Sequence, residues 1–252
     1  MNITMYMVTH KKVDFIPKGR TPICVGGCAG IEGAVLDSTG ESISYKNKNY
    51  CELTAMYWIW KNDFVSDVVS IEHYRRFWRK KKFIPIILYK SDIDNLLNNY
   101  DLVVSRYFRT KMKNGDYYKK WHYEEDLILA KEAIITLCPE YETSFNKVMT
   151  DDRLCLLNML IMRKADYNKY CEWLFDILSY VEERTDLSER TEYQKRIYGF
   201  LGERLFNVWL EYQDFNAGRL KIYYKDGGKI KSIIKSLYHS FSRPYNPKGE
   251  RL

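Results

Sequence analysis

Two arginines and a histidine stand together at the end of an apolar run, in the tetrapeptide His73-Tyr74-Arg75-Arg76. Guanidinium groups bind phosphate oxygens in bidentate pairs, so this cluster is suited to holding a diphosphate. The apolar residues before it predict a buried strand, which would deliver the cluster to the ligand-binding edge of a sheet. Runs of charge also commonly form solvated surface turns, and the sequence leaves that alternative open.

A second polar cluster follows the first apolar run. Residues 3–8 alternate and lead into Thr9, His10 and Lys11, which predicts contacts with a nucleotide at the same sheet edge. A structural role is the alternative for a lone histidine in such a place. Asn49 and Glu52 begin an apolar helix, where their alternative roles are a helix cap and an acid that offsets the helix dipole.

Glu203 is the first candidate for a general base. It follows Gly199 and Gly202 in an apolar helical segment, and we expect the two glycines to leave open space around the carboxylate. A surface ion pair with Arg204 is the competing role for this acid.

Asp126 is the second candidate for the base. It lies four residues after His122, close enough for a hydrogen bond across the start of a helix. The same pair could equally serve as a helix cap, and the sequence does not decide between the two roles.

Patterns typical of bound metals are missing from the sequence. The six cysteines form no CxxC pair, and no HExxH motif occurs, so no structural zinc is expected. The one DxD-like string, Asp92-Ile93-Asp94, falls at a predicted helix start. We therefore predict no metal ligands among the candidate residues.

Alternating strands and helices are expected to position these groups. The predicted strands cover residues 3–8, 21–26, 65–71, 101–105 and 154–162. The predicted helices cover residues 49–61, 91–99 with a cap at Ser91, 124–138, 165–183 and about 192–212, and residues 106–122 are expected to form a surface loop. This order predicts an α/β fold of the Rossmann type: a mostly parallel sheet flanked by helices, its site at the carboxyl ends of the strands and its C-terminal part helical.

The charge of the chain is concentrated at its end. The formal net charge is +7, but residues 221–252 hold eight basic and two acidic residues, which leaves residues 1–220 nearly neutral. We therefore predict a catalytic domain over residues 1–220 and a basic extension over 221–252. Residues 229–241 place apolar side chains on one helical face beside lysines, a pattern that fits an anionic membrane surface or docking on protein. No run of apolar residues is long enough to span a bilayer and no signal peptide is evident, so a cytoplasmic protein, peripheral at the inner membrane face, is expected.

Several long segments, taken in order, resemble the bacterial capsular and surface polysaccharide glycosyltransferases known under the DUF4422 heading. These segments are VTHKK, ISYKNKNYCELTAMYWIWKN, VSIEHYRRFW, the NML core of LLNMLIMRK, YCEWLFDIL and RIYGFLGERLFNVWL. The resemblance covers most of the chain, from about Met5 to about Tyr212. It implies a GT-A-like enzyme that transfers galactose or galactofuranose from a UDP-linked donor, with inversion, to a glycan on undecaprenyl diphosphate during capsule or O-antigen assembly.

The resemblance also implies roles for individual residues. GT-A enzymes carry a metal-binding DxD where this chain has its tetrapeptide, so a divalent Mg or Mn ion is in question and Arg75 or Arg76 would neutralise the leaving diphosphate. Glu203 would be the base. The remaining donor contacts would come from His10, Lys11, Asn49, Glu52, Asn158 and Met159, the last two on the central strand.

Aromatic residues in the range 106–121 support two different functions. In a glycosyltransferase, Tyr118, Trp121 and His122 would hold the acceptor, since aromatic faces pack on pyranose rings. In a non-enzymatic module, the aromatic rings would stack on the bases of a single-stranded nucleic acid; these rings are Tyr107, Phe108, Tyr117, Tyr118 and Trp121. The nearly neutral body of the chain argues against nucleic acid as a partner, because few phosphate contacts would be available.

Overall fold

The sheet forms from short apolar runs rich in β-branched residues. In the residues that this computed structural model describes (1–80, 86–225, 231 and 234), nine strands join one mixed sheet and two more form a small ribbon. The strands are β1 (Ile3–Thr9), β2 (Thr21–Cys24), β3 (Val35–Leu36), β4 (Val68–His73), β5 (Arg76–Trp78), β6 (Leu102–Ser105), β7 (Phe108–Arg109), β8 (Arg153–Leu154), β9 (Leu160–Arg163), β10 (Ala217–Leu220) and β11 (Ile222–Tyr224). The main path runs β10-β6-β9-β4-β1-β2-β3, and β5 pairs with both β4 and β11.

One strand in the middle of the sheet runs against its neighbours. β9 is antiparallel to both β4 and β6, whereas β4, β1, β2 and β3 are mutually parallel and β6 is parallel to β10. The chain therefore enters β9 at the edge where the parallel strands end. This topology brings residues before β9 beside the residues after β1 and β4.

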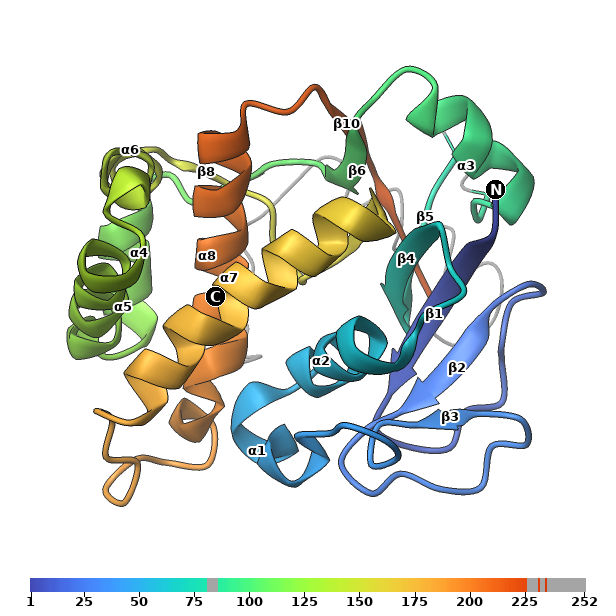
Figure 1. Cartoon of the computed structure of the whole chain (residues 1–252), viewed down its shortest axis with the longest axis horizontal. Coiled ribbons are helices and arrows are strands. Elements are labelled where there is room, and N and C mark those ends of the chain that lie inside the picture. Colours follow the sequence, from blue (N-terminus) through green and yellow to red (C-terminus); the bar gives the residue numbers. More distant parts are fainter. Residues whose placement is uncertain (81–85, 226–230, 232–233, 235–252) are drawn as a thin grey trace.

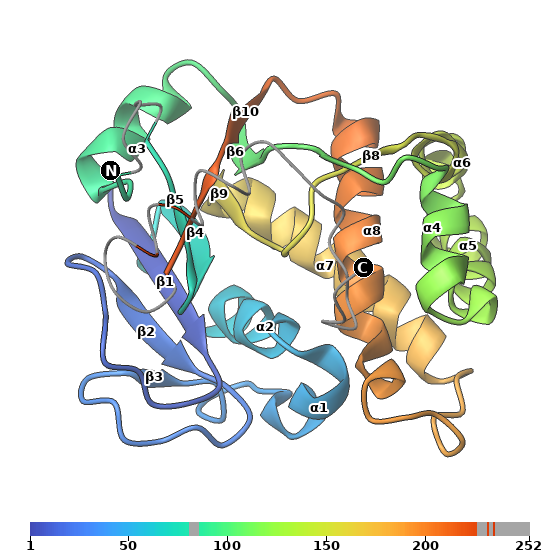
Figure 2. The same cartoon turned by 180° about the vertical axis from the view of Figure 1, so that it is seen from behind.

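Helices cover the sheet, and a further group of helices lies to one side of it. They are η1 (Ser44–Lys46), α1 (Asn47–Tyr50), α2 (Leu53–Asn62), α3 (Lys90–Leu97), α4 (Asn114–Trp121), α5 (Glu124–Leu137), η2 (Pro139–Tyr141), α6 (Glu142–Thr150), α7 (Lys164–Glu182), η3 (Gln194–Arg196) and α8 (Ile197–Gln213). Figures 1 and 2 show α2, α7 and α8 beside the sheet, with α4, α5 and α6 grouped beyond α8.

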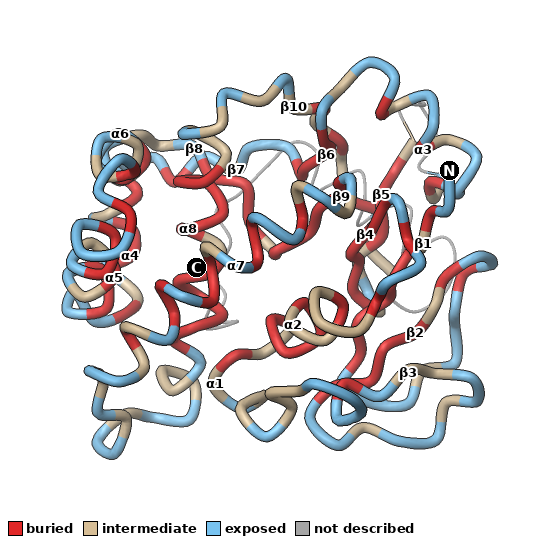
Figure 3. Tube along the Cα trace, viewed as in Figure 1, coloured by how far each residue is buried: buried red, intermediate tan, exposed pale blue. Residues whose placement is uncertain are grey.

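Alternation along the strands separates the two larger of three hydrophobic clusters among the described residues. On β6, Leu102 and Val104 join the larger core with α2, α5, α7 and α8, whereas Val103 joins a smaller core with α3 and the β5 residue Trp78. The buried stretches in Figure 3 follow the strands and much of α8. The side chains at the strand ends therefore project from buried, packed strands.

The structure confirms the α/β class and the helices predicted over 124–138 and 165–183, and it corrects several boundaries. The expected strand over 154–162 is broken between β8 and β9, because Leu157 and Asn158 have positive φ angles of 84° and 47°. The expected helix over 49–61 is divided at Cys51, whose φ is 54°. Ser91 lies inside α3, and Asp92 accepts the backbone N–H of Tyr89 at 2.8 Å instead.

The range 106–122 is structured, contrary to the expected loop. It forms β7, which pairs with β8, and the helix α4. Residues 222–224 form β11, so the sheet continues beyond the boundary predicted at residue 220. Residues 229–241, predicted as a membrane-binding helix, lie outside the described residues except for positions 231 and 234.

Candidate active site

The candidate site lies where β1, β4 and the start of β9 meet. Val8 pairs with His73 in the parallel register of β1 and β4, so the two strands end side by side. The turn before β9 lies against the same place, because the Nε2 atom of His73 is 2.6 Å from the carbonyl oxygen of Leu157. The first turns of α8 and the junction of α1 and α2 complete the enclosure.

A cavity of about 230 Å³ occupies this meeting point, which we call the charged cavity. Its lining combines cations and carboxylates with the aromatic rings of two tyrosines and a phenylalanine: His10, Cys51, Glu52, His73, Tyr74, Arg75, Arg76, Tyr117, His122, Leu157, Arg196, Gly199, Phe200, Glu203 and Arg204. The structure thus brings together the predicted tetrapeptide with His10, Glu52, His122 and Glu203.

The predicted tetrapeptide is a tight hairpin. His73 ends β4 and pairs with Arg76 at the start of β5, which leaves Tyr74 and Arg75 at the turn. The Tyr74 ring lies against the His10 ring at 5.3 Å between centroids and beneath the Arg75 guanidinium at 5.2 Å. Lys11 Nζ lies 5.5 Å from the centroid of the same ring, so three basic side chains lie around the Tyr74 ring.

The pKa of His10 reflects the positive charge at this edge of the sheet. Partial burial lowers its pKa most, and Lys11, Arg196 and Arg75 lower that pKa further by charge repulsion. A cavity edge with several cations and a neutral imidazole is suited to an anion with phosphate oxygens.

Glu203 forms the opposite side of the cavity. Its Oε1 accepts the Leu157 backbone N–H at 2.7 Å, and its Oε2 accepts a hydrogen bond from Arg204 Nη1 at 2.9 Å. Burial raises the pKa of Glu203, Arg204 opposes that shift, and the nearby Glu52 adds to it. A carboxylate with a raised pKa at a cavity wall is a candidate general base.

The side-chain amide of Asn158 holds Glu52 beside Glu203. Glu52 Oε1 accepts a hydrogen bond from Asn158 Nδ2 at 2.8 Å, and the same nitrogen lies 3.3 Å from the Gly199 carbonyl oxygen. Asn158 is buried and reaches Glu52 only because the chain bends at positive φ before β9. Asn158 therefore lies at this bend, and the prediction that it lies on a central strand is wrong.

The His73 ring is held as one neutral tautomer. A carbonyl oxygen can only accept, so the 2.6 Å contact with Leu157 places the ring proton on Nε2. Burial lowers the pKa of His73, Glu52 raises it and Arg76 lowers it. A neutral imidazole leaves the positive charge at the β4 end to the arginines.

Two predicted candidates are buried away from the cavity. Asp126 is 1% exposed, its Oδ1 lies 2.7 Å from Arg190 Nη2, and its Oδ2 accepts the Tyr118 hydroxyl at 2.9 Å. Tyr118 is fully buried. The predicted bond between His122 and Asp126 is replaced by one at 3.1 Å from His122 Nδ1 to Gln194 Oε1.

Other predicted residues also lie outside the lining. Met159 belongs to the smaller core. Asn49 lies within α1 and donates its Nδ2 to the Lys195 carbonyl at 2.8 Å. Thr9 is buried, and its hydroxyl donates to the Lys11 carbonyl at 2.6 Å, which shapes the loop after β1.

The two glycines before Glu203 have a different role from the expected one. A Cβ atom on Gly199 would lie 3.1 Å from Cys51 Sγ, and one on Gly202 would lie 2.9 Å from Leu53 Cδ1. They let α8 approach the α1–α2 junction closely, so the space is filled rather than open. This close approach places Glu203 beside Glu52.

Sequence reasoning missed part of the lining on α8. Arg196, Phe200 and Glu203 are spaced four and three residues apart, so they share one helix face. That spacing could have identified Arg196 and Phe200, because Glu203 was already a candidate. Cys51 and Leu157 gave no comparable signal, since both reach the cavity through bends at positive φ.

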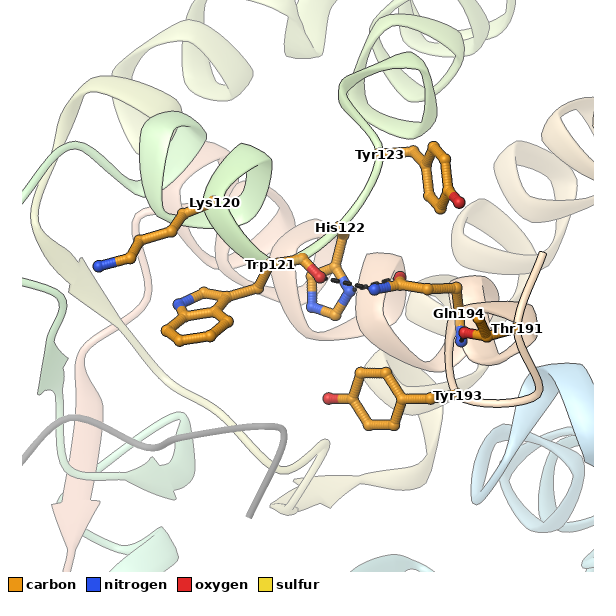
Figure 4. Close-up of a pocket in the computed structure, with 7 residues that line it drawn as sticks. All are labelled: Lys120, Trp121, His122, Tyr123, Thr191, Tyr193 and Gln194. Carbon is orange, nitrogen blue, oxygen red and sulfur yellow. Dashed lines mark hydrogen bonds between the residues drawn. The ribbon is translucent and has the colours of Figure 1, made fainter. Parts of the chain in front are cut away.

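A second, larger cavity of about 580 Å³ adjoins the first, and we call it the aromatic cavity. Figure 4 shows its lining side chains: Lys120, Trp121, His122, Tyr123, Thr191, Tyr193 and Gln194. His122 lines both cavities. The structure thus brings the predicted Trp121 and His122 together, whereas Tyr118 lies in the core.

The donor set does not fit a divalent metal. Among the described residues, no group of three or more His, Cys, Asp or Glu side chains could hold a metal ion. The two carboxylates of the charged cavity, Glu52 and Glu203, are engaged by Asn158, Leu157 and Arg204. A hard cation prefers several converging oxygen ligands, which these residues do not supply.

Comparisons with known proteins agree with this architecture. The solved structure "WbbM bifunctional glycosytransferase apo structure" matches with a TM-score of 0.81 and 27% identity, over 90% of this chain and 46% of that one. This chain therefore spans less than half of that protein, and the likeness confirms the predicted GT-A-like fold. A search of curated proteins gave no match. In the part of the chain that the structure describes, no helix is long and apolar enough to cross a membrane.

The family is identified by its sequence profile. The profile described as "Domain of unknown function (DUF4422)" matches residues 4–214. The match covers most of the chain, including the strand ends, the turn before β9 and the first turns of α8. The chain therefore belongs to the DUF4422 family.

Proposed function

We propose that the protein is a glycosyltransferase that moves a sugar from a nucleoside diphosphate donor to a hydroxyl group of a glycan. One observation carries the proposal: basic side chains and a carboxylate of raised pKa face the same small cavity at the strand ends. The likeness to a protein named as a bifunctional glycosyltransferase supports it.

The basic edge would bind the donor diphosphate. Arg75 and Arg76 stand on the hairpin after β4, and Arg196, the last residue of η3, lines the same cavity just before α8. Negative charge grows on the leaving phosphate oxygen as the bond to the sugar breaks, and fixed guanidinium groups stabilise that charge. The arginines would thereby supply the charge that a divalent metal provides elsewhere.

Glu203 would activate the acceptor. Its carboxylate takes the proton of the acceptor hydroxyl while that oxygen bonds to the anomeric carbon, and the bond between this carbon and the diphosphate oxygen breaks. The products are the glycoside, the nucleoside diphosphate and a protonated Glu203, which then releases its proton to solvent. A single displacement of this kind inverts the anomeric centre. Burial raises the pKa of Glu203, which makes its carboxylate a stronger base.

Glu52, Asn158 and His73 would position these groups. Asn158 holds Glu52 at 2.8 Å, and His73 fixes the turn before β9 through Leu157. The backbone N–H of the same Leu157 holds Glu203. The base and the β4 end are therefore linked through one residue, which keeps the distance between base and diphosphate site constant.

The finer identity of the substrates rests on the resemblance found in the sequence. We propose a UDP-linked donor of galactose or galactofuranose and a glycan acceptor on undecaprenyl diphosphate, in capsule or O-antigen synthesis. The reaction would take place in the cytoplasm, at the inner face of the membrane, with residues 229–241 as the contact to anionic lipid. Removing residues 229–252 should release the protein from anionic liposomes; unchanged binding would contradict the membrane contact.

Nucleic-acid binding receives little support from the fold. Of the aromatic side chains in the range 106–121, Tyr117 and Tyr118 are buried. Buried rings cannot stack on bases, so the range does not form a continuous stacking surface.

A panel of nucleotide sugars tests the proposed function. Donor hydrolysis and thermal shift would be measured for UDP-, GDP- and TDP-linked sugars, each with and without EDTA. We expect one donor class to stabilise the protein and to be hydrolysed slowly, equally well in EDTA. The absence of both signals across the panel would contradict the proposal, and loss of both in EDTA would contradict the role given to the arginines.

A further inference from the structure

The aromatic cavity has two walls joined by one side chain. Residues 120–123, at the junction of α4 and α5, form one wall, and Thr191, Tyr193 and Gln194 form the other. Gln194 donates its Nε2 to the Trp121 carbonyl oxygen at 2.7 Å, and its Oε1 lies 3.1 Å from His122 Nδ1 (Figure 4). The cavity is therefore a preformed feature whose walls are fastened together by hydrogen bonds.

The chemistry of the lining favours a neutral polyol. Trp121, Tyr123 and Tyr193 contribute aromatic rings to the lining, and Thr191 contributes a hydroxyl group. Lys120 is the one charged side chain among the described lining residues. A polyanion would need several cations in the lining. An apolar ligand would leave the polar groups of the lining without hydrogen-bond partners. Sugar rings have apolar C–H faces and hydroxyl edges, which suit this mixture.

His122 connects this cavity to the charged cavity. An amide oxygen can only accept, so the contact with Gln194 places the ring proton on Nδ1 and makes Nε2 an acceptor. Burial lowers the pKa of His122 to about 4, which keeps the ring neutral. Phe200, which lines the charged cavity, packs on His122 at 4.1 Å and on Tyr193 at 5.2 Å between ring centroids.

We propose that the aromatic cavity is a subsite for neutral hexose units of the acceptor glycan, those that precede the unit receiving the new sugar. The inference rests on the proposed function. The volumes fit this division: the charged cavity of about 230 Å³ holds the reacting groups, and the aromatic cavity of about 580 Å³ has room for further sugar units. A glycan that enters past Trp121 and Tyr193 reaches Glu203 by passing His122.

Binding of oligosaccharides tests the subsite without any need for turnover. Saturation-transfer-difference NMR would be recorded with neutral gluco-, galacto- and manno-configured oligosaccharides of one to four units. We expect binding that strengthens from one unit to two or more. In the variant Trp121→Ala the affinity should fall about tenfold, the loss expected when one anchoring aromatic ring is removed.

Two further variants guard against a folding defect. Thr191→Trp adds bulk at an exposed position of the lining and should reduce oligosaccharide binding without removing any core side chain. Tyr45→Ala removes an aromatic ring that is 81% exposed and lies in neither lining, and binding should persist in this control. Equal binding in wild type, Trp121→Ala and Thr191→Trp would overturn the proposal, as would the absence of binding by the whole panel. Tighter, salt-sensitive binding of a single-stranded oligonucleotide would also overturn it.

The subsite and the proposed function fail in different ways. If the protein binds oligosaccharides through Trp121 but no nucleotide sugar, the subsite stands and the glycosyltransferase assignment fails. If the protein transfers sugar and Trp121→Ala raises the KM of a long acceptor no more than the KM of the donor, the assignment stands and the subsite fails.

Discussion

Two buried arginine–carboxylate pairs in this protein have the same chemistry and different surroundings. Glu72, on β4, accepts hydrogen bonds from Arg20 Nε at 2.8 Å, from Arg20 Nη2 at 3.1 Å and from the Trp78 backbone N–H at 2.6 Å, and both charged side chains are 0% exposed. Glu203 accepts one bond each from Leu157 and Arg204, and its side chain is 12% exposed at a cavity wall.

Strand geometry explains why the β4 residue Glu72 is enclosed while its neighbour His73 opens onto the cavity that Glu203 lines. Glu72 and His73 are neighbours on β4, so their side chains point to opposite faces of the sheet. Glu72 is enclosed beneath β5, whereas His73 faces the charged cavity. A carboxylate with both oxygens hydrogen-bonded and no access to solvent stabilises the fold, and one that retains access to a cavity can exchange a proton.

The largest effect on stability is expected at the enclosed pair. Arg20→Met would leave Glu72 buried without its cation, and we expect the free energy of unfolding to fall by about 3–5 kcal/mol. Urea unfolding followed by circular dichroism measures this change. Adding Glu72→Gln to Arg20→Met should recover part of the loss, because the uncompensated charge is removed.

An exposed pair provides the control for this comparison. Arg109 pairs with Asp152 at 2.9 Å, and their side chains are 67% and 38% exposed. Arg109→Ala should change stability by less than about 1 kcal/mol. If Arg109→Ala and Arg20→Met proved equally destabilising, burial would not be what distinguishes the two kinds of pair.

The basic edge of the charged cavity should control donor affinity. Arg76→Ala removes a guanidinium next to His73, and we expect the Kd for UDP to rise about 10- to 100-fold, as for a lost charge-assisted hydrogen bond. Isothermal titration calorimetry measures the change, with Arg109→Ala as a charge-matched control outside both linings. Unchanged UDP affinity in Arg76→Ala would place the diphosphate elsewhere.

His122 should make the free energy of unfolding depend on pH. Its folded pKa of about 4 lies below its unfolded value, so the unfolded state binds more protons between the two and stability falls as the pH decreases through that window. From about pH 7.5 to about pH 5, we expect the free energy of unfolding to fall by about 2 kcal/mol more in wild type than in His122→Gln. Parallel losses in the two proteins would show that the neutral ring does not contribute.

The fold and the strand-end cluster could be predicted from the sequence because local patterns encode them. The apolar runs before Thr9 and the tetrapeptide located β1 and β4, and the spacing of apolar residues located α5 and α7. The break before β9 could not be predicted, since LCLLNMLIM is apolar apart from Asn158 and its bend depends on hydrogen bonds to distant residues. Asn158 reaches Glu52, 106 positions away.

The surroundings of Asp126 and Glu203 also could not be predicted from the sequence. Asp126 and Glu203 both lie in apolar helical stretches, yet Asp126 is enclosed by Tyr118 and Arg190, whereas Glu203 lines a cavity. Such differences arise from which helices meet, and periodicity within one segment does not report them. The glycines before Glu203 show the same limit, because their role in close packing depends on α1 and α2.

Turnover by Glu203→Gln tests the central claim most directly. The amide oxygen can still accept the Leu157 N–H, but it cannot take a proton from the acceptor. With the donor identified by the panel, kcat should fall about 10²- to 10⁴-fold while the Kd for UDP stays within about threefold of wild type. Near-normal turnover in Glu203→Gln would show that the base lies elsewhere and would contradict the assignment of the charged cavity as the catalytic site.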